Sequence, residues 1–416
     1  MNKIVIEGGR PLKGTVTVHG AKNAVLPILA ATILNEGVSV IHNCPDLRDV
    51  RITVEILEYL GAVVKREGDT LTVDASGKIG SHIPEGLMRQ LRSSIVFMGS
   101  ILGRNKRAKI SAPGGCELGP RPIDLHIKAL KDMGVRIRET HGYIICGGQN
   151  MEGTNIHLSF PSVGATENIM LAACRMEGKT VISNVAKEPE IVDLAEFLNA
   201  MGAKIEGAGS SDITITGVRE LRPAEYTVMP DRIVAVTYLC CAAVTGGEIR
   251  IRRVVPEHIS ACMSCLKDCG CEIETGEDWV KLSAPERLKA IRDIRTMPYP
   301  GFPTDAQSLF LSMLCVADGT SVIEEMIFES RFKHVEELIR MGADVKVNGQ
   351  VAVIRGVPEL SGAPVSAADL RGGAALVIAA LCADGVTEIE NPHFIDRGYE
   401  NLEENLTQLG ANIRRV

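Results

Sequence analysis

The sequence predicts an α/β protein of two domains, each built from three copies of a repeat about 70 residues long. Three observations lead to this prediction. The chain has 416 residues, which is too long for one ordinary core. A pattern of Leu, three residues, Gly, two residues and Val or Ile recurs six times, with its glycines 68 to 73 residues apart. A second set of six segments is apolar on nearly every helical face.

In each copy of the pattern, an amphipathic helix runs up to the glycine, which is expected to end it in the left-handed conformation. A strand with alternating polarity follows, and then a turn and a second strand. The turn at Asn348-Gly349 is one example. The six copies are Leu57–Gly61–Val64, Leu130–Gly134–Ile137, Leu198–Gly202–Ile205, Leu266–Gly270–Ile273, Leu338–Gly342–Val345 and Leu406–Gly410–Ile413.

The second helix of each repeat is expected inside its domain, because a helix that is apolar all round has no face for water. Sheets must then cover these helices on the outside. The six candidates are Asn23–Leu34, Arg92–Leu102, Thr166–Met176, Arg232–Val244, Asp305–Ala317 and Arg371–Ala383.

The composition is that of a globular protein that does not bind polyanions. Hydrophobic residues make up 45% of the chain and charged residues 23%. The net charge of −7 argues against nucleic acid and anionic membranes as partners, because both attract a basic surface. An anionic ligand would have to be held by a local group of cations.

The sequence indicates a cytoplasmic location. Met1–Gly20 has no cationic stretch followed by an apolar run, so no signal peptide is expected. Apolar runs such as Leu309–Ala317 are too short to span a bilayer. The twelve cysteines are therefore read as reduced thiols.

Four cysteines close together leave two interpretations open. Cys262, Cys265, Cys269 and Cys271 have a spacing that a metal site could use, although spacing is its only support. Cys269 and Cys271 occupy repeat positions that carry Leu or Met and Ala or Val in the other copies, which favours small core residues.

Polar residues stand at the starts of the apolar helices, and further arginines lie near the starts of the other helix set. Helix N-termini suit anions, and the arginine fork matches carboxylate and phosphate oxygens. Any one of these residues could instead be a solvated surface residue or an ion-pair partner. The set is Lys22, Asn23, Arg92, Arg121, Arg232, Asp305, Arg331, Arg371 and Arg397.

The segment Ser111–Pro122 is expected to form a loop, because it contains three glycines and three prolines. It presents Cys116 near Arg121, and a neighbouring cation favours the reactive thiolate. The alternative is a buried, unreactive thiol. His126 follows on the next helix as a supporting or capping residue.

Several motifs together resemble one family over nearly the whole chain, from about Ile4 to Ile413. The motifs are Gly20-Ala21-Lys22-Asn23-Ala24, Gly114-Gly115-Cys116, Arg121-Pro122-Ile123-Asp124, Ser162-Val163-Gly164-Ala165-Thr166, Glu188-Pro189-Glu190-Ile191-Val192-Asp193, Gly301-Phe302-Pro303-Thr304-Asp305, Asp369-Leu370-Arg371 and Asp396-Arg397-Gly398-Tyr399-Glu400. The chain thereby resembles the enolpyruvyl transferases that act on UDP-N-acetylglucosamine in the first committed step of peptidoglycan synthesis. Ser330, Val234 and Val236 depart from that family's pattern.

The resemblance implies a two-domain inside-out α/β barrel, with helices buried, sheets outside and substrates in the cleft between the domains. One domain would comprise residues 1–21 and 230–416, and the other residues 22–229 with the Cys116 loop. Phosphoenolpyruvate and UDP-N-acetylglucosamine would be the substrates, and a fosfomycin-type inhibitor would react at Cys116. No metal or other cofactor is expected.

By the same resemblance, one set of residues would bind phosphoenolpyruvate: Lys22, Asn23, Arg121, Arg331, Arg371 and Arg397. A second set would bind UDP-N-acetylglucosamine: Arg92, Arg121, Pro122, Ile123, Asp124, Leu125, Ser162, Val163, Gly164, Asp305 and Ile327. Asp305 would be the general base for the sugar 3-hydroxyl. Cys116 would donate a proton, form a covalent adduct or assist product release.

Three other functions remain open on the sequence. The nearest is the related transferase acting on shikimate 3-phosphate, against which the Cys116 loop and the Ser162–Thr166 motif argue. A non-catalytic paralogue would be expected to lose Cys116, Asp305 or the arginines. A protein-binding repeat scaffold gives no reason for charged residues at buried helix starts.

Overall fold

The computed structural model describes residues 3–111 and 123–416, and these form two compact units. One unit contains the described residues up to His19 and those from Pro230 to Val416. The other contains the described residues between Gly20 and Met229. Each unit has its own hydrophobic core.

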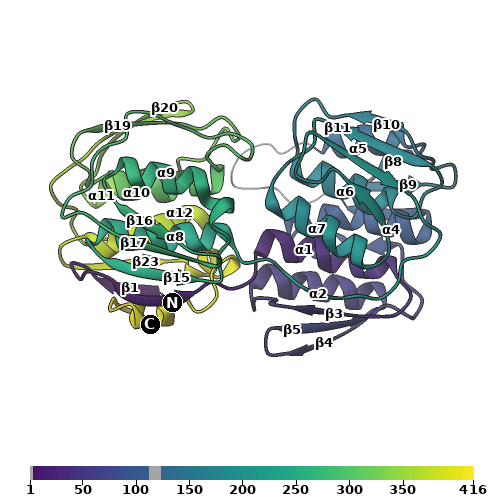
Figure 1. The fold of residues 1–416 in the computed structure, drawn as a ribbon, viewed down its shortest axis with the longest axis horizontal. Coiled ribbons are helices and arrows are strands. Elements are labelled where there is room, and N and C mark those ends of the chain that lie inside the picture. Colours follow the sequence, from purple (N-terminus) through teal and green to yellow (C-terminus); the bar gives the residue numbers. More distant parts are fainter. Residues whose placement is uncertain (1–2, 112–122) are drawn as a thin grey trace. The chain divides into compact units, whose positions relative to one another are not determined.

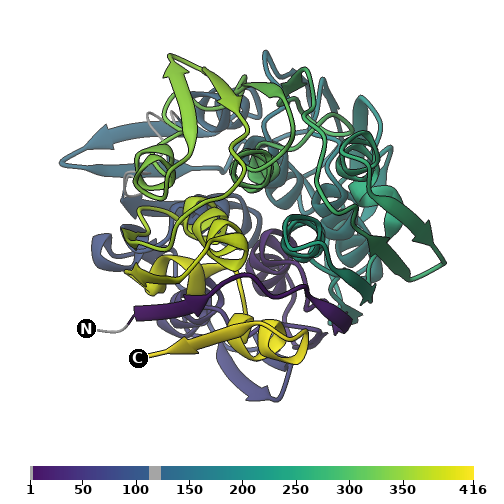
Figure 2. The same cartoon turned by 90° about the vertical axis from the view of Figure 1, so that its left-hand side faces the viewer.

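Three buried helices form the centre of the first unit. They are α8 (Arg232–Val244), α10 (Thr304–Leu314) and α12 (Leu370–Cys382), and nearly all of their residues are buried. In Figure 2 they appear near the middle of this unit, with strands around them. An all-apolar helix surface explains this position, as the sequence predicts.

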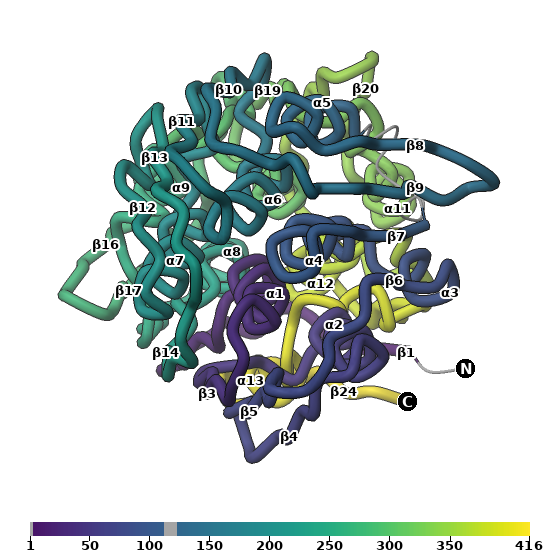
Figure 3. The backbone as a smooth tube through the Cα atoms, turned by 90° about the vertical axis from the view of Figure 1, so that its right-hand side faces the viewer, coloured from purple at the N-terminus to yellow at the C-terminus, as the bar shows by residue number. Residues whose placement is uncertain are grey.

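The second unit has the same design, with α1 (Lys22–Ala31), α4 (Phe97–Asn105) and α6 (Val163–Ala173) inside (Figure 3). Glycine allows α4 and α6 to approach closely. A Cβ atom on Gly99 would lie 2.4 Å from the Asn168 carbonyl oxygen, and one on Gly103 would lie 2.8 Å from that of Leu171. Short 3₁₀ turns extend two of these helices, η1 (Thr32–Leu34) after α1 and η2 (Arg92–Val96) before α4.

The other helix set ends at the glycines that the sequence marks. Gly61, Gly134, Gly202, Gly270, Gly342 and Gly410 all have positive φ angles, between 86° and 107°, which confirms the predicted left-handed caps. The helices are α2 (Arg48–Leu60), α5 (Asp124–Asp132), α7 (Pro189–Ala200), α9 (Ser260–Asp268), α11 (Val335–Arg340) and α13 (Leu402–Gln408). Short turns complete the helical elements: α3 (Glu85–Met88), η3 (Pro256–Ile259) and η4 (Pro392–Arg397).

The structure has one four-stranded sheet for each repeat, and the six sheets share one pattern. An edge strand pairs in parallel with the second strand, and the second, third and fourth strands pair antiparallel to one another in turn. In the first unit their orders are β2 (Lys13–Thr17), β15 (Glu248–Arg252), β17 (Trp279–Ser283), β16 (Glu272–Thr275); β18 (Ile294–Arg295), β19 (Thr320–Glu324), β21 (Val351–Arg355), β20 (Asp344–Asn348); and β22 (Pro364–Ser366), β23 (Val386–Glu390), β1 (Lys3–Glu7), β24 (Asn412–Arg415). In the second unit they are β14 (Glu225–Thr227), β3 (Val38–His42), β5 (Thr70–Asp74), β4 (Val63–Glu67); β6 (His82–Ile83), β7 (Arg107–Ser111), β9 (Tyr143–Gly147), β8 (Arg136–Thr140); and β10 (Asn155–His157), β11 (Lys179–Ser183), β13 (Asp212–Thr216), β12 (Lys204–Glu206).

The chain ends meet in one of these sheets. Strand β1 lies between β23 and β24, with Ile4 opposite Ile389 and Ile6 opposite Ile413. The N-terminal strand therefore supplies the strand that the sixth repeat lacks at its own end. In four repeats, the parallel edge strand pairs with the strand that follows the next buried helix in the chain. The exceptions are β2 and β14, because the chain crosses to the other unit after each of them. β2 pairs with β15 and β14 pairs with β3, so each strand belongs to a sheet of the unit that the chain is leaving.

The described cysteines behave as core residues. Cys262, Cys269 and Cys271 are buried and Cys265 is half-buried. Among residues 3–111 and 123–416, no group of three or more His, Cys, Asp or Glu side chains has the arrangement of metal ligands. None of the helices in the described ranges combines the length and hydropathy that a bilayer crossing requires.

Candidate active site

One carboxylate in the first unit is held by two buried guanidinium groups. Asp305 lies in the first turn of α10, and Arg331 Nη2 donates to its Oδ1 at 2.7 Å. Arg371 donates to its Oδ2 from Nη2 at 3.1 Å and from Nε at 3.3 Å. The Arg331 and Arg371 side chains are 3% and 4% exposed, whereas that of Asp305 is 26% exposed. The structure thus brings together three of the predicted residues, with two cations directed at a partly exposed position.

Local capping fixes the backbone of Arg371. Asp369 is the N-cap of α12, and its Oδ1 accepts the backbone N–H groups of Arg371 at 3.0 Å and Gly372 at 2.9 Å. Burial acts to lower the pKa of Arg371, but the neighbouring Tyr399 and Asp305 outweigh it, so the net direction is upward. Arg371 therefore stays charged at any ordinary pH.

Arg397 lies at the end of η4, which packs against the start of α12. A Cβ atom on Gly373 would lie 2.7 Å from Ile395 Cγ1, so only glycine allows η4 to approach this closely. Arg397 is half-buried there. This packing places the turn that carries Arg397 on the helix whose first turn carries Arg371.

Glu325 connects the start of α10 to the segment containing Ile327. Its carboxylate is fully buried and accepts the hydroxyls of Thr296 at 3.1 Å and Thr304 at 2.9 Å. It also accepts the backbone N–H groups of Ile327 at 2.9 Å and Phe328 at 3.0 Å. The sequence does not mark Glu325 as a site residue, because its only local signal is a carboxylate directly after strand β19.

In the second unit, the motif around Lys22 is shaped by a close backbone approach. A Cβ atom on Gly20 would lie 1.8 Å from the carbonyl oxygen of Asn43, so this position accepts only glycine. Lys22 then opens α1 and pairs with the buried Asp49, Nζ to Oδ2 at 3.3 Å. Asn23 is exposed beside it. The sequence does not reveal Asp49 as a partner of Lys22, because the two residues lie 27 positions apart.

Seven of the residues predicted for the nucleotide sugar are described in this unit, whereas Asp305 and Ile327 belong to the first unit. Ser162 caps α6 by accepting the N–H of Ala165 at 3.3 Å, and Val163 and Gly164 form the first turn. A Cβ atom on Gly164 would lie 3.1 Å from His126 Cε1, so the first turn of α6 touches the first turn of α5. Ile123, Asp124 and Leu125 immediately precede His126 on that side, and Arg92 opens η2.

Asn168, which the sequence analysis missed, ties these elements together. Its Oδ1 accepts the N–H of Gly99 at 2.7 Å, and its Nδ2 donates to the carbonyl of Ile95 at 3.0 Å and to His126 Nδ1 at 2.7 Å. The two backbone partners fix which end of the Asn168 amide carries the nitrogen, so Nδ2 donates to His126 Nδ1. Because Nδ1 accepts this hydrogen bond, the proton of the neutral imidazole is on Nε2. Burial, aided by the charge of Arg92, lowers the pKa of His126 to about 4.

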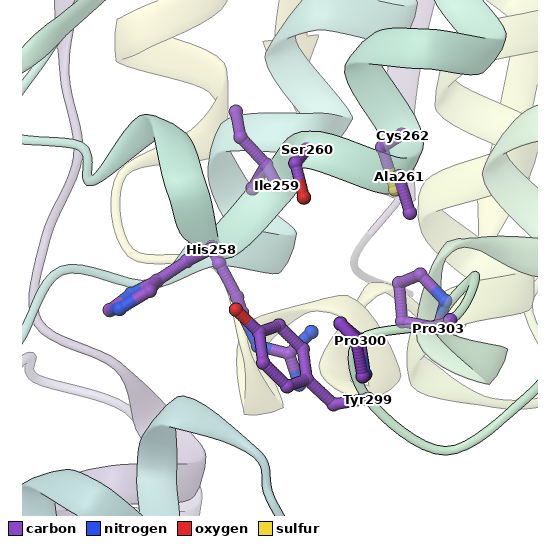
Figure 4. A pocket seen from close by; sticks show the side chains of 10 residues that line it. His258, Ile259, Ser260, Ala261, Cys262, Tyr299, Pro300 and Pro303 are labelled. Carbon is purple, nitrogen blue, oxygen red and sulfur yellow. The ribbon is translucent and has the colours of Figure 1, made fainter. Parts of the chain in front are cut away.

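A small pocket in the first unit is lined by other residues than those predicted to bind substrate. Its lining includes Arg232, His258, Cys262 and Tyr299, and Figure 4 shows the Tyr299 ring on the side opposite the Cys262 turn. The Arg232 guanidinium carbon lies 5.7 Å from the Tyr299 ring centroid. None of the residues predicted for either substrate lines this pocket, so we do not assign it to the reaction.

Three predicted site residues, Cys116, Arg121 and Pro122, lie outside the described residues. The eleven described cysteines all have raised pKa values, with burial as the leading cause. These thiols are therefore poor nucleophiles at neutral pH.

Comparison with known proteins gives consistent results along the whole chain. Residues 6–406 match the family model described as EPSP synthase (3-phosphoshikimate 1-carboxyvinyltransferase). The chain is 58% identical over 416 residues to UDP-N-acetylglucosamine 1-carboxyvinyltransferase 2 of Caldanaerobacter subterraneus subsp. tengcongensis, with full coverage of both proteins. It is 51% identical to UDP-N-acetylglucosamine 1-carboxyvinyltransferase 1 of Symbiobacterium thermophilum, covering 100% of this chain and 95% of that one.

Solved structures agree on the fold. The chain is similar to the enolpyruvyl transferase NikO from Streptomyces tendae, with a TM-score of 0.89, 27% identity and coverage of 100% and 99% of the two chains. It also resembles EPSP synthase from Acinetobacter baumannii, with a TM-score of 0.77, 19% identity and full coverage of both. The predicted inside-out α/β fold, with buried helices and outer sheets, is confirmed.

Proposed function

The chain belongs to the enolpyruvyl transferase family, among the UDP-N-acetylglucosamine 1-carboxyvinyltransferases, and we propose that it moves the 1-carboxyvinyl group of phosphoenolpyruvate to the 3-hydroxyl of UDP-N-acetylglucosamine. The observation that carries this proposal is the 58% identity over the full length of a protein with that name. The reaction would release phosphate and begin peptidoglycan synthesis in the cytoplasm.

The phosphoenolpyruvate carboxylate would bind to Arg331 and Arg371. Both guanidinium groups are buried and both already hold a carboxylate, that of Asp305. An arriving carboxylate can take over these contacts, because the arginine fork accepts either anion. Lys22, Arg121 and Arg397 would then bind the phosphate group of the same molecule.

This exchange would also release the base. In the structure both oxygens of Asp305 accept hydrogen bonds from arginine. Once the substrate carboxylate replaces it, Asp305 can accept the proton of the sugar 3-hydroxyl as the hydroxyl oxygen bonds to C2 of phosphoenolpyruvate. Binding of phosphoenolpyruvate would thus free the group that starts the reaction.

The remaining steps are an addition and an elimination. A proton, for which Cys116 is our candidate donor, reaches C3 and converts the methylene to a methyl group. Loss of a proton from that methyl group then expels phosphate and restores the double bond. The cations stabilise the charge on the intermediate and on the leaving phosphate, and one such contact contributes about 3 kcal/mol to the transition state. No metal or cofactor enters this scheme.

The nucleotide sugar would bind mainly to the second unit. The clustered first turns of α5 and α6 offer Ile123, Asp124, Leu125, Ser162, Val163 and Gly164. Arg92, Arg121 and Pro122 would complete this side. Asp305 and Ile327 of the first unit, with Asn23 of the second, would contact the sugar.

Phosphate release by the purified protein tests the proposal. Phosphate should appear only when phosphoenolpyruvate and UDP-N-acetylglucosamine are both present, and shikimate 3-phosphate should not replace the sugar. Arg397→Ala should lower the rate more than about tenfold through loss of a charged contact. Phosphate release from phosphoenolpyruvate with shikimate 3-phosphate as acceptor, and none with UDP-N-acetylglucosamine, would instead assign the activity that the family model names.

A second experiment addresses Cys116. Fosfomycin should alkylate this thiol in the presence of UDP-N-acetylglucosamine, and peptide mass spectrometry should find the adduct at one site. The other eleven thiols offer little competition, because their pKa values are raised. An unmodified Cys116 would remove it from the proposed site.

A further inference from the structure

A chain of hydrogen bonds behind Arg371 leads away from the proposed substrate position. Arg371 Nη1 donates to the hydroxyl oxygen of Tyr399 at 3.1 Å. That hydroxyl lies 2.8 Å from Thr237 Oγ1, and Thr237 Oγ1 donates to the carbonyl oxygen of Ile233 at 2.8 Å. Tyr399, Thr237 and Arg371 are all buried in the first unit.

The direction of each hydrogen bond follows from the groups involved. A guanidinium has only donors, so Tyr399 cannot give its proton to Arg371. The oxygen of Thr237 is the other partner of that hydroxyl and accepts the proton. The proton of Thr237 goes in turn to the Ile233 carbonyl, one helical turn earlier in α8. Burial raises the pKa of Tyr399, which keeps the phenol protonated.

This arrangement determines which edge of Arg371 is available to a ligand. Nη1 is directed at Tyr399, and the edge formed by Nε and Nη2 faces Asp305 Oδ2. That edge is the one that can bind a carboxylate with two parallel hydrogen bonds. Once a substrate carboxylate displaces Asp305, the hydrogen bond to Tyr399 is the contact among these that still holds the guanidinium in this orientation.

We propose that Tyr399 is a positioning residue, and that with Thr237 it orients the Nε/Nη2 edge of Arg371 toward the carboxylate of the three-carbon substrate. The inference rests on the proposed function, since it takes Arg371 to be a ligand of phosphoenolpyruvate. Tyr399 itself touches no reacting atom. Its effect should therefore appear in the binding of phosphoenolpyruvate and hardly at all in that of the nucleotide sugar.

The test compares Tyr399→Phe with Tyr238→Phe as its matched control. Tyr238 is equally buried in the same unit, and its hydroxyl contacts only the side chain of Asn405, at 3.0 Å, among the hydrogen bonds described. Tyr399→Phe should raise KM for phosphoenolpyruvate about tenfold, the value of one buried hydrogen bond to a charged group. The KM for UDP-N-acetylglucosamine should stay within about twofold of wild type, and Tyr238→Phe should change neither constant.

Variants of Thr237 distinguish a positioning role of the Tyr399 hydroxyl from a purely structural role of the tyrosine ring. Thr237→Val should also raise KM for phosphoenolpyruvate, because the Tyr399 proton loses its acceptor, and Thr237→Ser should restore it. The double variant with Tyr399→Phe should be no worse than Tyr399→Phe alone, since phenylalanine has no proton to place. If Tyr399→Phe does not fold, this valine–serine pair carries the test.

The outcomes separate the two proposals. If the wild-type protein releases no phosphate with the two substrates, the proposed function fails and the inference fails with it. If the wild type is active and Tyr399→Phe keeps the wild-type KM for phosphoenolpyruvate, only the inference is overturned. Additive effects of the Thr237→Val and Tyr399→Phe changes would likewise overturn it.

Discussion

Replacing Glu325 tests whether one buried carboxylate holds the start of α10 to the Ile327 segment. Glu325→Ala removes the acceptor of two hydroxyls and two backbone N–H groups. The threonine hydroxyls can rotate to other acceptors, but the N–H groups of Ile327 and Phe328 cannot. Each unsatisfied donor costs about 1–3 kcal/mol, and both residues are half-buried, so water relieves part of this. We expect a loss of about 3 kcal/mol.

For a unit of this size, 3 kcal/mol corresponds to a fall in melting temperature of about 10 °C. Glu325→Gln keeps the shape and one acceptor oxygen but loses the charge, so its loss should be about half as large. Calorimetry would measure both, and phosphate release at 25 °C should fall more than tenfold in Glu325→Ala if the segment positions Ile327 and Asp305 as proposed. The expected losses follow from hydrogen bonds to a buried charge, which contribute about 1.5–3 kcal/mol each.

The adjacent residue provides the control. Glu324 forms an exposed ion pair with Arg295 at 2.7 Å, and such pairs contribute about 0–1 kcal/mol. Glu324→Gln should therefore melt within about 3 °C of wild type and keep full activity. If Glu325→Ala melted no lower than this control, the carboxylate would not be holding the two segments together.

Three further changes test other contacts. Gly20→Ala should lower stability by about 2 kcal/mol or more and activity more than tenfold, because the added Cβ meets the Asn43 carbonyl. Calorimetry and phosphate release would measure these two effects, and a wild-type melting temperature would contradict the prediction. Asp49→Asn removes a buried counter-charge of the Lys22 ammonium, so stability should fall by about 2 kcal/mol and KM for phosphoenolpyruvate should rise. Unchanged values would exclude this ion pair as a support. The pKa of His126 in the folded protein is about 4, below its ordinary 6.5. The neutral imidazole therefore contributes up to about 3 kcal/mol to stability above pH 6.5, and this contribution is lost as the pH falls toward 4. In His126→Gln, the fall in melting temperature over that pH range should be smaller, and an identical pH dependence would refute this assignment.

Local sequence patterns predicted the six repeats because backbone conformation at a helix end and burial of an apolar helix depend mainly on nearby residues. Gly61 and its five counterparts adopt the left-handed conformation that a side chain resists. The boundaries of the buried helices were less well predicted. Helix α6 begins at Val163 rather than Thr166, since Ser162 caps it, and the segment beginning at Arg92 first forms a 3₁₀ turn before α4. Such shifts depend on a single capping or packing contact.

The supporting residues of the candidate site could not be predicted in this way. Asn168 bonds to residues 42, 69 and 73 positions away, and Tyr399 reaches Thr237 across 162 positions. A buried asparagine or tyrosine has no local pattern that names its partner. The charged residues of the candidate site were easier to find, because Lys22, Asp305 and Arg371 interrupt apolar helices at their first turns.

The position of β1 has a consequence for synthesis. During synthesis β1 (Lys3–Glu7) emerges before β23 (Val386–Glu390) and β24 (Asn412–Arg415), the two strands that complete its hydrogen bonding, and almost the whole sequence lies between them. The stretch ending at Met229 holds every strand of its own three sheets and can mature while translation continues. A product truncated before β23 would leave β1, with its apolar side chains Ile4 and Ile6, without either neighbouring strand. Chaperones and proteases would be expected to act on such a product.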